Sequence, residues 1–264
     1  MKFYRLYETS ARLLNKVFFK LLGIRITRNP IFGDEIKEVD IDAFKTLSSV
    51  MERTMTDENR LYNLILATRY IVQNKIEGDF VECGVWRGGS MMAIALTLLQ
   101  SNASDRHLFL YDTFQGMTAP SDLDRRLSGE LASQLLIDSK ENLQGEYSQG
   151  IYAYASIEDV KSGMNETTYP YSLIHFIEGK VEETLLNCSH NKISLLRLDT
   201  DWYESTKVEL ECLWDSLVVG GVLILDDYDH WAGARIATDE FFLKKGIHPL
   251  LMKMAAGRIL IKQS

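Results

Sequence analysis

The chain has 264 residues, of which 46% are hydrophobic and 25% charged. This length is enough for one α/β domain with additions, whose core is large enough to fold without disulfide bonds or structural metals. Its formal net charge of -8 excludes nucleic acid as the main partner, because phosphate binding depends on Lys and Arg. Cys83, Cys188 and Cys212 show no CxxC spacing, which predicts buried thiols in the reducing cytoplasm. No apolar run reaches the roughly 18 residues that span a bilayer, and no secretory signal is expected.

Residues 1–45 are predicted to form a basic amphipathic arm. Within residues 1–28, seven Lys or Arg against Glu8 give a net charge of +6, which leaves -14 for the rest of the chain. Leu, Val and Phe side chains alternate with these charges, as in an amphipathic helix. The favoured interpretation is packing against the body of the protein or a partner subunit of a homo-oligomer, and the alternative is weak contact with a membrane surface.

Residues 46–264 are predicted to form the main domain, which begins with a helix over residues 57–76. Short apolar runs then alternate with helical patterns, and this indicates an α/β fold with a parallel sheet covered on both faces. The strands are expected at 80–83, 108–111, 173–177, 195–198 and 222–225, and the helices at 90–99, 156–164, 181–186 and 205–219.

Two segments depart from this alternation. Residues 248–254 and 258–262 are predicted to be a closing pair of strands, with an antiparallel strand at the sheet edge. Residues 118–150 are polar and carry no strand signal. So long an interruption predicts either a mobile lid or a separate helical insertion.

A glycine-rich turn, residues 84–90, joins the first predicted strand to its helix. Gly84 and Gly88 allow a ligand to approach the backbone closely, and the helix N–H groups would face that ligand. Ser90 is expected to cap the helix, to contact the cofactor carboxylate, or both. The turn lacks the GxGxxG pattern, so a tight turn with no ligand is the alternative.

Asp112 ends the second predicted strand, where a carboxylate can accept both ribose hydroxyls of an adenosine group. Aspartate is also common at strand ends because it favours turns. Together with the glycine-rich turn, Asp112 predicts an adenosine-containing cofactor at the C-terminal edge of the sheet. NAD and S-adenosylmethionine both satisfy this prediction.

Acidic residues follow two neighbouring strands. Asp199 and Asp201 follow the strand at 195–198, and Asp226 and Asp227 follow the next one. Adjacent strands lie about 4.8 Å apart, so Asp199, Asp226 and Asp227 are expected to share one small space. Crowded carboxylates repel unless they are protonated or bridged by a cation, and this set suits Mg²⁺ or Mn²⁺. Solvated loop acids and helix N-caps are the alternative.

Four blocks of the sequence, in order, resemble the macrocin O-methyltransferase family, which contains metal-dependent sugar O-methyltransferases. The blocks are GDFVECGVWRGGS at 78–90, YDTFQGM at 111–117, LRLDTDWYEST at 196–206 and the segment from Gly220 to Tyr228. The resemblance covers roughly residues 50–262. It implies a class I methyltransferase fold. Together with the residue patterns described above, it predicts a doubly wound, mostly parallel seven-stranded sheet with an antiparallel C-terminal edge strand and an N-terminal helical extension.

The resemblance also implies site residues. S-adenosylmethionine would bind around Glu82, Gly84 and Asp112, and Asp201 would be the general base. The implied Mg²⁺ ligands are Asp199, Asp226 and Asp227. Two features depart from the family: residues 118–150 are longer than its usual linker, and the basic arm has no clear counterpart.

The preferred hypothesis is therefore methyl transfer from S-adenosylmethionine to a hydroxyl of a small acceptor, a sugar or glycosylated metabolite, with metal and base assisting. A catechol-like phenol is the rival acceptor. A degenerate module that only binds cofactor is a second rival, against which the intact acids argue. An NAD oxidoreductase would leave the paired acids unexplained.

Overall fold

The computed structural model describes residues 39–140, 147–148, 150–187 and 189–263. Residues 40–264 form one compact unit, to which the following description applies. The predicted basic arm falls mainly on residues 1–38, which lie outside the described residues.

The unit is built on a seven-stranded sheet with the strand order β3-β2-β1-β4-β5-β7-β6. The first five strands in this order are parallel, and β7 and β6 are antiparallel to their neighbours. The strands are β1 (Asp79–Cys83), β2 (Leu108–Asp112), β3 (Ile174–Glu178), β4 (Ile193–Leu198), β5 (Leu217–Leu225), β6 (Met252–Met254) and β7 (Gly257–Ile261).

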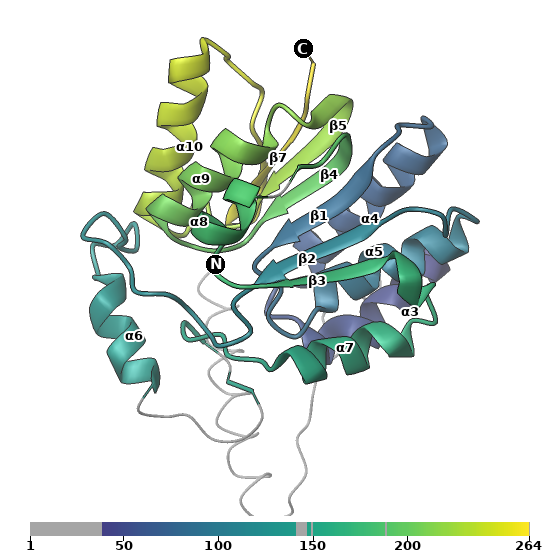
Figure 1. Ribbon diagram of the computed structural model, residues 1–264, viewed down its shortest axis with the longest axis horizontal. Coiled ribbons are helices and arrows are strands. Elements are labelled where there is room, and N and C mark those ends of the chain that lie inside the picture. Colours follow the sequence, from purple (N-terminus) through teal and green to yellow (C-terminus); the bar gives the residue numbers. More distant parts are fainter. Residues whose placement is uncertain (1–38, 141–146, 149, 188, 264) are drawn as a thin grey trace, which may run out of the picture. The chain divides into compact units, whose positions relative to one another are not determined.

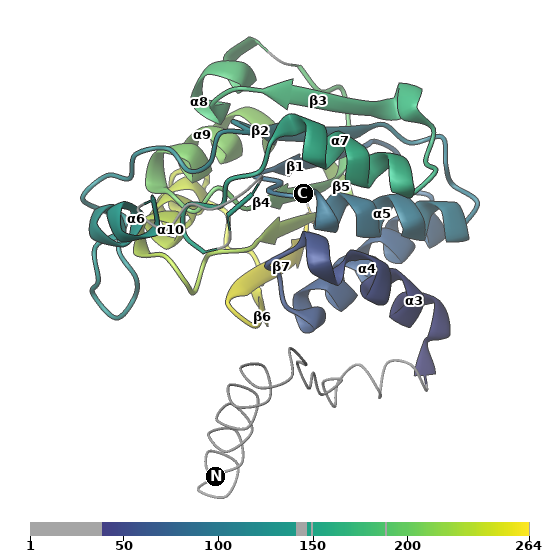
Figure 2. The same ribbon diagram turned by 90° about the horizontal axis from the view of Figure 1, so that it is seen from below.

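Helices cover both faces of this sheet (Figures 1 and 2). On one side lie α3 (Ile41–Val50), α4 (Glu58–Gln73), α5 (Gly89–Gln100) and α7 (Ile157–Glu166), and on the other α8 (Val181–Thr184), α9 (Tyr203–Leu213) and α10 (Ala232–Lys245). The arrangement confirms the predicted doubly wound α/β fold with an antiparallel edge. None of the helices described is long and apolar enough to cross a membrane.

The central strand β4 is buried along its whole length, as expected for a strand covered on both faces. Its sequence, ISLLRL, is apolar except for Ser194 and Arg197, and both of these side chains are also buried. Arg197 is among the largest side chains excluded from solvent. A buried guanidinium in the middle strand requires carboxylates beside it.

Two predicted elements have different bounds. The helix expected over residues 205–219 ends at Leu213, and β5 already begins at Leu217, which pairs with Ile193 of β4. Residues 217–219, which helical periodicity assigned to the helix, therefore belong to β5. The strand expected at 248–254 shortens to Met252–Met254, because only these residues pair with β7.

Within the stretch 118–150, the described residues contain α6 (Ala132–Lys140). Isolated bridges pair Arg125 with Leu131 and Arg126 with Trp231. The second bridge ties this segment to the residue immediately before α10. The segment therefore reaches the C-terminal edge of the sheet, where the predicted site residues lie.

Candidate active site

A cavity of about 320 Å³ opens at the C-terminal ends of β1, β2, β4 and β5. Seven of the nine residues singled out from the sequence line it: Gly84, Ser90, Asp112, Asp199, Asp201, Asp226 and Asp227. The structure thus brings the glycine-rich turn and the acidic residues to a single cavity. Glu82 and Gly88 are not part of its lining.

The glycine-rich turn brings the ends of two strands close together. Gly84 has a φ of 81°, and a Cβ on it would lie 2.1 Å from the carbonyl oxygen of Asp199. Only glycine fits such an approach. Gly88, with the same φ, is the N-cap of α5. The N-cap role considered for Ser90 is therefore taken by Gly88, and Ser90 instead faces the cavity.

Asp112 organises this turn through backbone hydrogen bonds. Its carboxylate accepts the amide N–H groups of Val85 at 2.7 Å, Trp86 at 3.2 Å and Phe114 at 2.8 Å. Burial raises the pKa of Asp112, and these N–H donors act in the opposite direction. The bond from Phe114 is the turn role that the sequence suggested as an alternative, whereas the bonds from Val85 and Trp86 were not predicted. Ribose binding by Asp112 stays a prediction, for which its place in the cavity lining is suitable.

Asp199, Asp226 and Asp227 form the predicted acidic cluster. One carboxylate oxygen of each lies within 4.8 Å of those of the other two. Backbone hydrogen bonds from Asp199 to Cys83 and from Asp226 to Leu198 extend the sheet ladders to this point. The proximity therefore follows from the strand register.

Asp201 is not one of the three carboxylates of this cluster. Its φ of 70° places it in the left-handed region, so the chain turns after Asp199 instead of continuing as a strand. In an extended continuation of β4, the side chains of Asp199 and Asp201 would point the same way, and this turn prevents that arrangement. Asp201 still lines the cavity, and Asp227 is its hydrogen-bonding neighbour.

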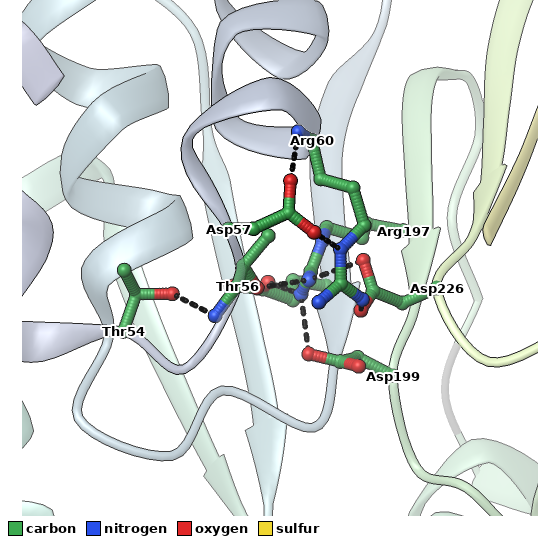
Figure 3. Close-up of polar contacts among 8 residues, drawn as sticks. Thr54, Thr56, Asp57, Arg60, Arg197, Asp199 and Asp226 are labelled. Atoms are coloured by element: carbon green, nitrogen blue, oxygen red, sulfur yellow. Dashed lines mark hydrogen bonds and ion pairs between the residues drawn. The ribbon is translucent and has the colours of Figure 1, made fainter. Parts of the chain in front are cut away.

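Arg197 lies among the acids (Figure 3). Its guanidinium donates to Glu82, to Asp199 at 2.7 Å, to Asp226 at 2.8 Å and to the Thr56 hydroxyl at 3.0 Å. Sequence reasoning missed Arg197, although a lone Arg in an apolar strand was a usable signal. The contact also explains Glu82, whose carboxylate is fully buried beneath the cavity and meets Arg197 instead of the cavity itself.

A second guanidinium approaches from α4. Arg60 forms an ion pair with Asp226 and another with Asp57, the N-cap of α4, at 2.8 Å (Figure 3). Arg60 and the preceding residues Thr54 and Thr56 line the cavity. The N-terminal end of α4 is thus held over the acidic cluster by charge, and Arg60 was also missed from the sequence.

Carboxyl groups outnumber guanidinium groups around the acidic cluster. Burial raises the pKa of Glu82 and of Asp201 to about 7 each, and it holds the pKa values of Asp199 and Asp227 well above their usual range. One oxygen of Glu82 and the Oδ2 atom of Asp227 are buried without a hydrogen-bond partner. Such atoms are costly unless something binds them.

The donor set fits a hard divalent cation. Three carboxylates leave coordination positions open for water or an acceptor, as Mg²⁺ and Mn²⁺ sites require. The unpartnered Oδ2 of Asp227 is the atom that such an ion would satisfy. Asp226 differs, because each of its oxygens already accepts from a guanidinium group. Metal binding there would share an oxygen with Arg60 or Arg197.

Known proteins resemble this chain in sequence. The model of the family Macrocin-O-methyltransferase (TylF) matches residues 36–258. The chain is 28% identical over 195 residues to a demethyldecarbamoylnovobiocin O-methyltransferase of Streptomyces niveus, with 72% of this chain and 68% of that relative covered. A tetracenomycin-C 4'-O-methyltransferase of Streptomyces olivaceus, acting on the 8-demethyl-8-(2,3-dimethoxy-alpha-L-rhamnosyl) form, is 30% identical over 175 residues. That match covers 66% of this chain but only 62% of the relative's length.

Solved structures agree with this assignment. The O-methyltransferase NovP has a TM-score of 0.69 and 26% identity, with 80% of this chain and 83% of that chain covered. The calicheamicin methyltransferase CalS11 has a TM-score of 0.61 at 19% identity, covers 97% of this chain and 92% of that chain, and shows likeness of fold alone. Since the family model spans most of the sequence, the chain belongs to the macrocin O-methyltransferase family of O-methyltransferase enzymes.

Proposed function

We propose that this protein transfers a methyl group from S-adenosylmethionine to a hydroxyl of a sugar or glycosylated small molecule. One observation carries the proposal: the glycine-rich turn and the acids after β4 and β5 line the same cavity in a chain of this family. The relatives support the acceptor class, because the methyltransferase of Streptomyces olivaceus is named for a substrate with a rhamnosyl group.

The β1–β2 side of the cavity would hold the cofactor. The turn after β1 exposes backbone groups next to the N-terminal end of α5, where N–H groups have no helical partner. Ser90 offers a hydroxyl in the cavity wall, and Asp112 is the acid available to ribose hydroxyls. Glu82 contributes indirectly, by fixing Arg197 in the wall of the cavity.

The β4–β5 side would bind and activate the acceptor. Asp199, Asp226 and Asp227 would hold a divalent ion, and such an ion supplies Lewis-acid lowering of a hydroxyl pKa. Asp201 is our general base: it lies in the cavity wall, it is not one of the three proposed metal ligands, and its hydrogen bond with Asp227 keeps it beside the proposed ion, where it would take the hydroxyl proton. The acceptor oxygen then forms its bond to the methyl carbon, and the electron pair of the broken carbon–sulfur bond stays on sulfur.

The orientation of the acceptor would depend on the walls. Met117, Ile151 and Trp231 give the cavity an apolar side that suits the apolar face of a sugar ring. Trp231 is held by an edge-on contact with Trp202, with ring centroids 5.1 Å apart. Alignment of oxygen, methyl and sulfur by such walls is the expected source of much of the rate.

The test combines calorimetry with turnover. Wild-type protein should bind S-adenosylmethionine and its demethylated product, and should not bind NAD. Methyl transfer to a panel of glycosides and catechols then identifies the acceptor class. Absence of cofactor binding would refute the proposal, and turnover of catechols alone would replace the sugar by a phenol.

Metal dependence is tested separately. EDTA should abolish turnover reversibly, and Asp227→Ala should abolish it with the cofactor affinity retained, because Asp227 lies on the acceptor side. Mn²⁺ binding measured by calorimetry should disappear in the same variant. Full activity after exhaustive chelation would leave base catalysis by Asp201 without metal.

A further inference from the structure

The segment between β2 and α6 is anchored to the site by a buried carboxylate. Asp124 is 1% exposed. Its Oδ1 accepts the N–H of Tyr203, the first residue of α9, at 2.7 Å, and its Oδ2 accepts both the N–H and the hydroxyl of Ser121 at 2.7 Å. The Asp124 carbonyl accepts the N–H of Ala132, where α6 begins. This loop is therefore fixed to the catalytic framework.

The anchored loop carries Arg126 to the cavity wall. Arg126 forms an isolated bridge with Trp231, and the preceding Arg125 carbonyl accepts the N–H of Ala232 at 2.8 Å. The Arg126 side chain lines the cavity, and its buried Nε has no hydrogen-bond partner. Its guanidinium meets Glu130 at 3.3 Å, and more than half of that carboxylate side chain is exposed and lies outside the cavity lining.

Arg126 differs in this respect from the two other arginines of the wall. Arg60 and Arg197 line the same cavity but are ion-paired with its own acids, Asp226 among them. No ion pair between Arg126 and a cavity acid is found among the described residues. Arg126 is thus a cation in the wall whose charge is directed to no acid of the site.

Arg126 also lies on the acceptor side. In the sheet order β2-β1-β4-β5, the predicted cofactor residues follow β1 and β2, whereas Trp231, which holds Arg126, follows β5. We infer that Arg126 forms an anion-binding subsite for a phosphate or carboxylate group on the acceptor, beside the hydroxyl that receives the methyl group. This inference rests on the proposed function.

The chemistry of the two neighbouring surfaces would orient such an acceptor. A guanidinium presents a planar fork of N–H donors that matches phosphate and carboxylate oxygens. Asp201, the proposed base, can take a proton from a hydroxyl, whereas an ionised phosphate or carboxylate oxygen has no proton to give it. An acceptor with an anionic group and a hydroxyl would therefore place the anion at Arg126 and the hydroxyl at the acids, and the reverse orientation would be disfavoured.

The experiment uses full-length protein saturated with S-adenosylhomocysteine in the presence of Mg²⁺. Calorimetry gives the affinities for glucose, glucose 1-phosphate and glucuronate, which share a ring and differ in the charged group. Wild-type protein should bind at least one of the two anions about tenfold more tightly than glucose. The anion that binds more tightly than glucose shows whether the acceptor carries a phosphate or a carboxylate.

Two variants assign the effect to Arg126. Arg126→Gln should abolish the preference for the anion and keep the affinity for S-adenosylhomocysteine. Arg125→Gln is the matched control and should change neither, because Arg125 is exposed, donates to the Asp122 carbonyl and is outside the cavity lining.

The inference is overturned if wild-type protein shows no preference for either anion, including no measurable binding of the three sugars. A preference that survives Arg126→Gln also overturns it. Loss of S-adenosylhomocysteine binding in Arg126→Gln would instead assign Arg126 to the cofactor. Failure of the proposed function is distinct, since wild-type protein would then not bind S-adenosylhomocysteine at all.

Discussion

The two sides of the cavity lie at the same edge of the sheet but are stabilised by different interactions. On the β1–β2 side, the carboxylate of Asp112 at the end of β2 accepts from three backbone N–H groups. On the β4–β5 side, several carboxylates compete for two guanidinium groups, those of Arg60 and Arg197. The first side is fixed by hydrogen bonds within the chain, and the second has charge left to neutralise.

The difference indicates how the work of the site is divided. A turn that is held by the hydrogen bonds of Asp112 is a rigid platform, suited to holding one cofactor in one orientation. A cluster with an unpartnered oxygen at Asp227 and raised carboxyl pKa values can gain from a cation or from a proton donor. Four pairs of substitutions test this contrast, and the effects that we expect decrease from Asp201 to Glu209.

The largest effect is expected at Asp201. Asp201→Asn is nearly isosteric but removes the base, so kcat should fall on the order of 10²–10⁴-fold with cofactor and metal affinities close to wild type. Asp199→Asn is the comparison: it should weaken Mn²⁺ binding first and recover some activity at high Mg²⁺. Steady-state kinetics and calorimetry on both variants check this, and reversed phenotypes would exchange the two assigned roles.

Arg197→Met tests the charge balance of the β4–β5 side. Glu82 would remain fully buried without its cation, so the free energy of unfolding should fall by about 3–5 kcal/mol. The control is Arg235→Met, which removes a half-exposed partner of Asp229 and should cost less than about 1 kcal/mol. Urea denaturation measures both free energies of unfolding. Equal losses in the two variants would show that the buried Arg197 ion pairs stabilise the fold no more than the pair of Arg235 with Asp229.

Asp112→Ala tests the β1–β2 side. Affinity for S-adenosylhomocysteine should weaken by about 1.5–3 kcal/mol, the contribution of a charge-assisted hydrogen bond. Glu178→Ala is the matched control, because Glu178 pairs in register with Asp112 at the end of β3 but is exposed and outside the cavity. Calorimetry showing unchanged affinity in Asp112→Ala would remove Asp112 from the cofactor site.

The smallest effect is expected behind the acidic cluster, at Glu209 of α9. Its carboxyl is buried, accepts from the Thr200 hydroxyl at 2.9 Å and leaves Oε2 without a partner, and burial raises its pKa well above the usual range. The folded protein therefore retains a proton that the unfolded chain has lost, so stability falls as pH rises from the unfolded pKa through the folded one.

Glu209→Gln should remove this part of the pH dependence and gain about 1 kcal/mol at alkaline pH. Glu211→Gln, on an exposed position of the same helix, is the control and should leave the pH profile unchanged. Thermal unfolding across pH gives the comparison. If the unfolding temperatures of Glu209→Gln and wild type changed with pH in the same way, Glu209 would not be the group that retains the proton.

The sheet and the edge that carries the site could be predicted from the amino-acid pattern alone. Apolar runs of strand length are excluded from water wherever they lie, so the five parallel strands and the closing antiparallel pair were predictable. The acids after β4 and β5 were predictable too, because neighbouring parallel strands end at one edge. Local patterns failed where pairing overrides periodicity, as at Leu217, where sheet register begins β5 inside a predicted helix.

Which charged side chains pair with one another could not be predicted before the three-dimensional fold was known. The ion pair of Arg60 with Asp226 joins residues 166 positions apart, and no spacing in the sequence encodes it. The same holds for Arg197 beneath the acids and for Arg126 beside Trp231. Periodicity reports whether a side chain faces water or the core, whereas the partner of a buried charge depends on how whole elements pack, because a charge removed from water must find its counter-charge in three dimensions.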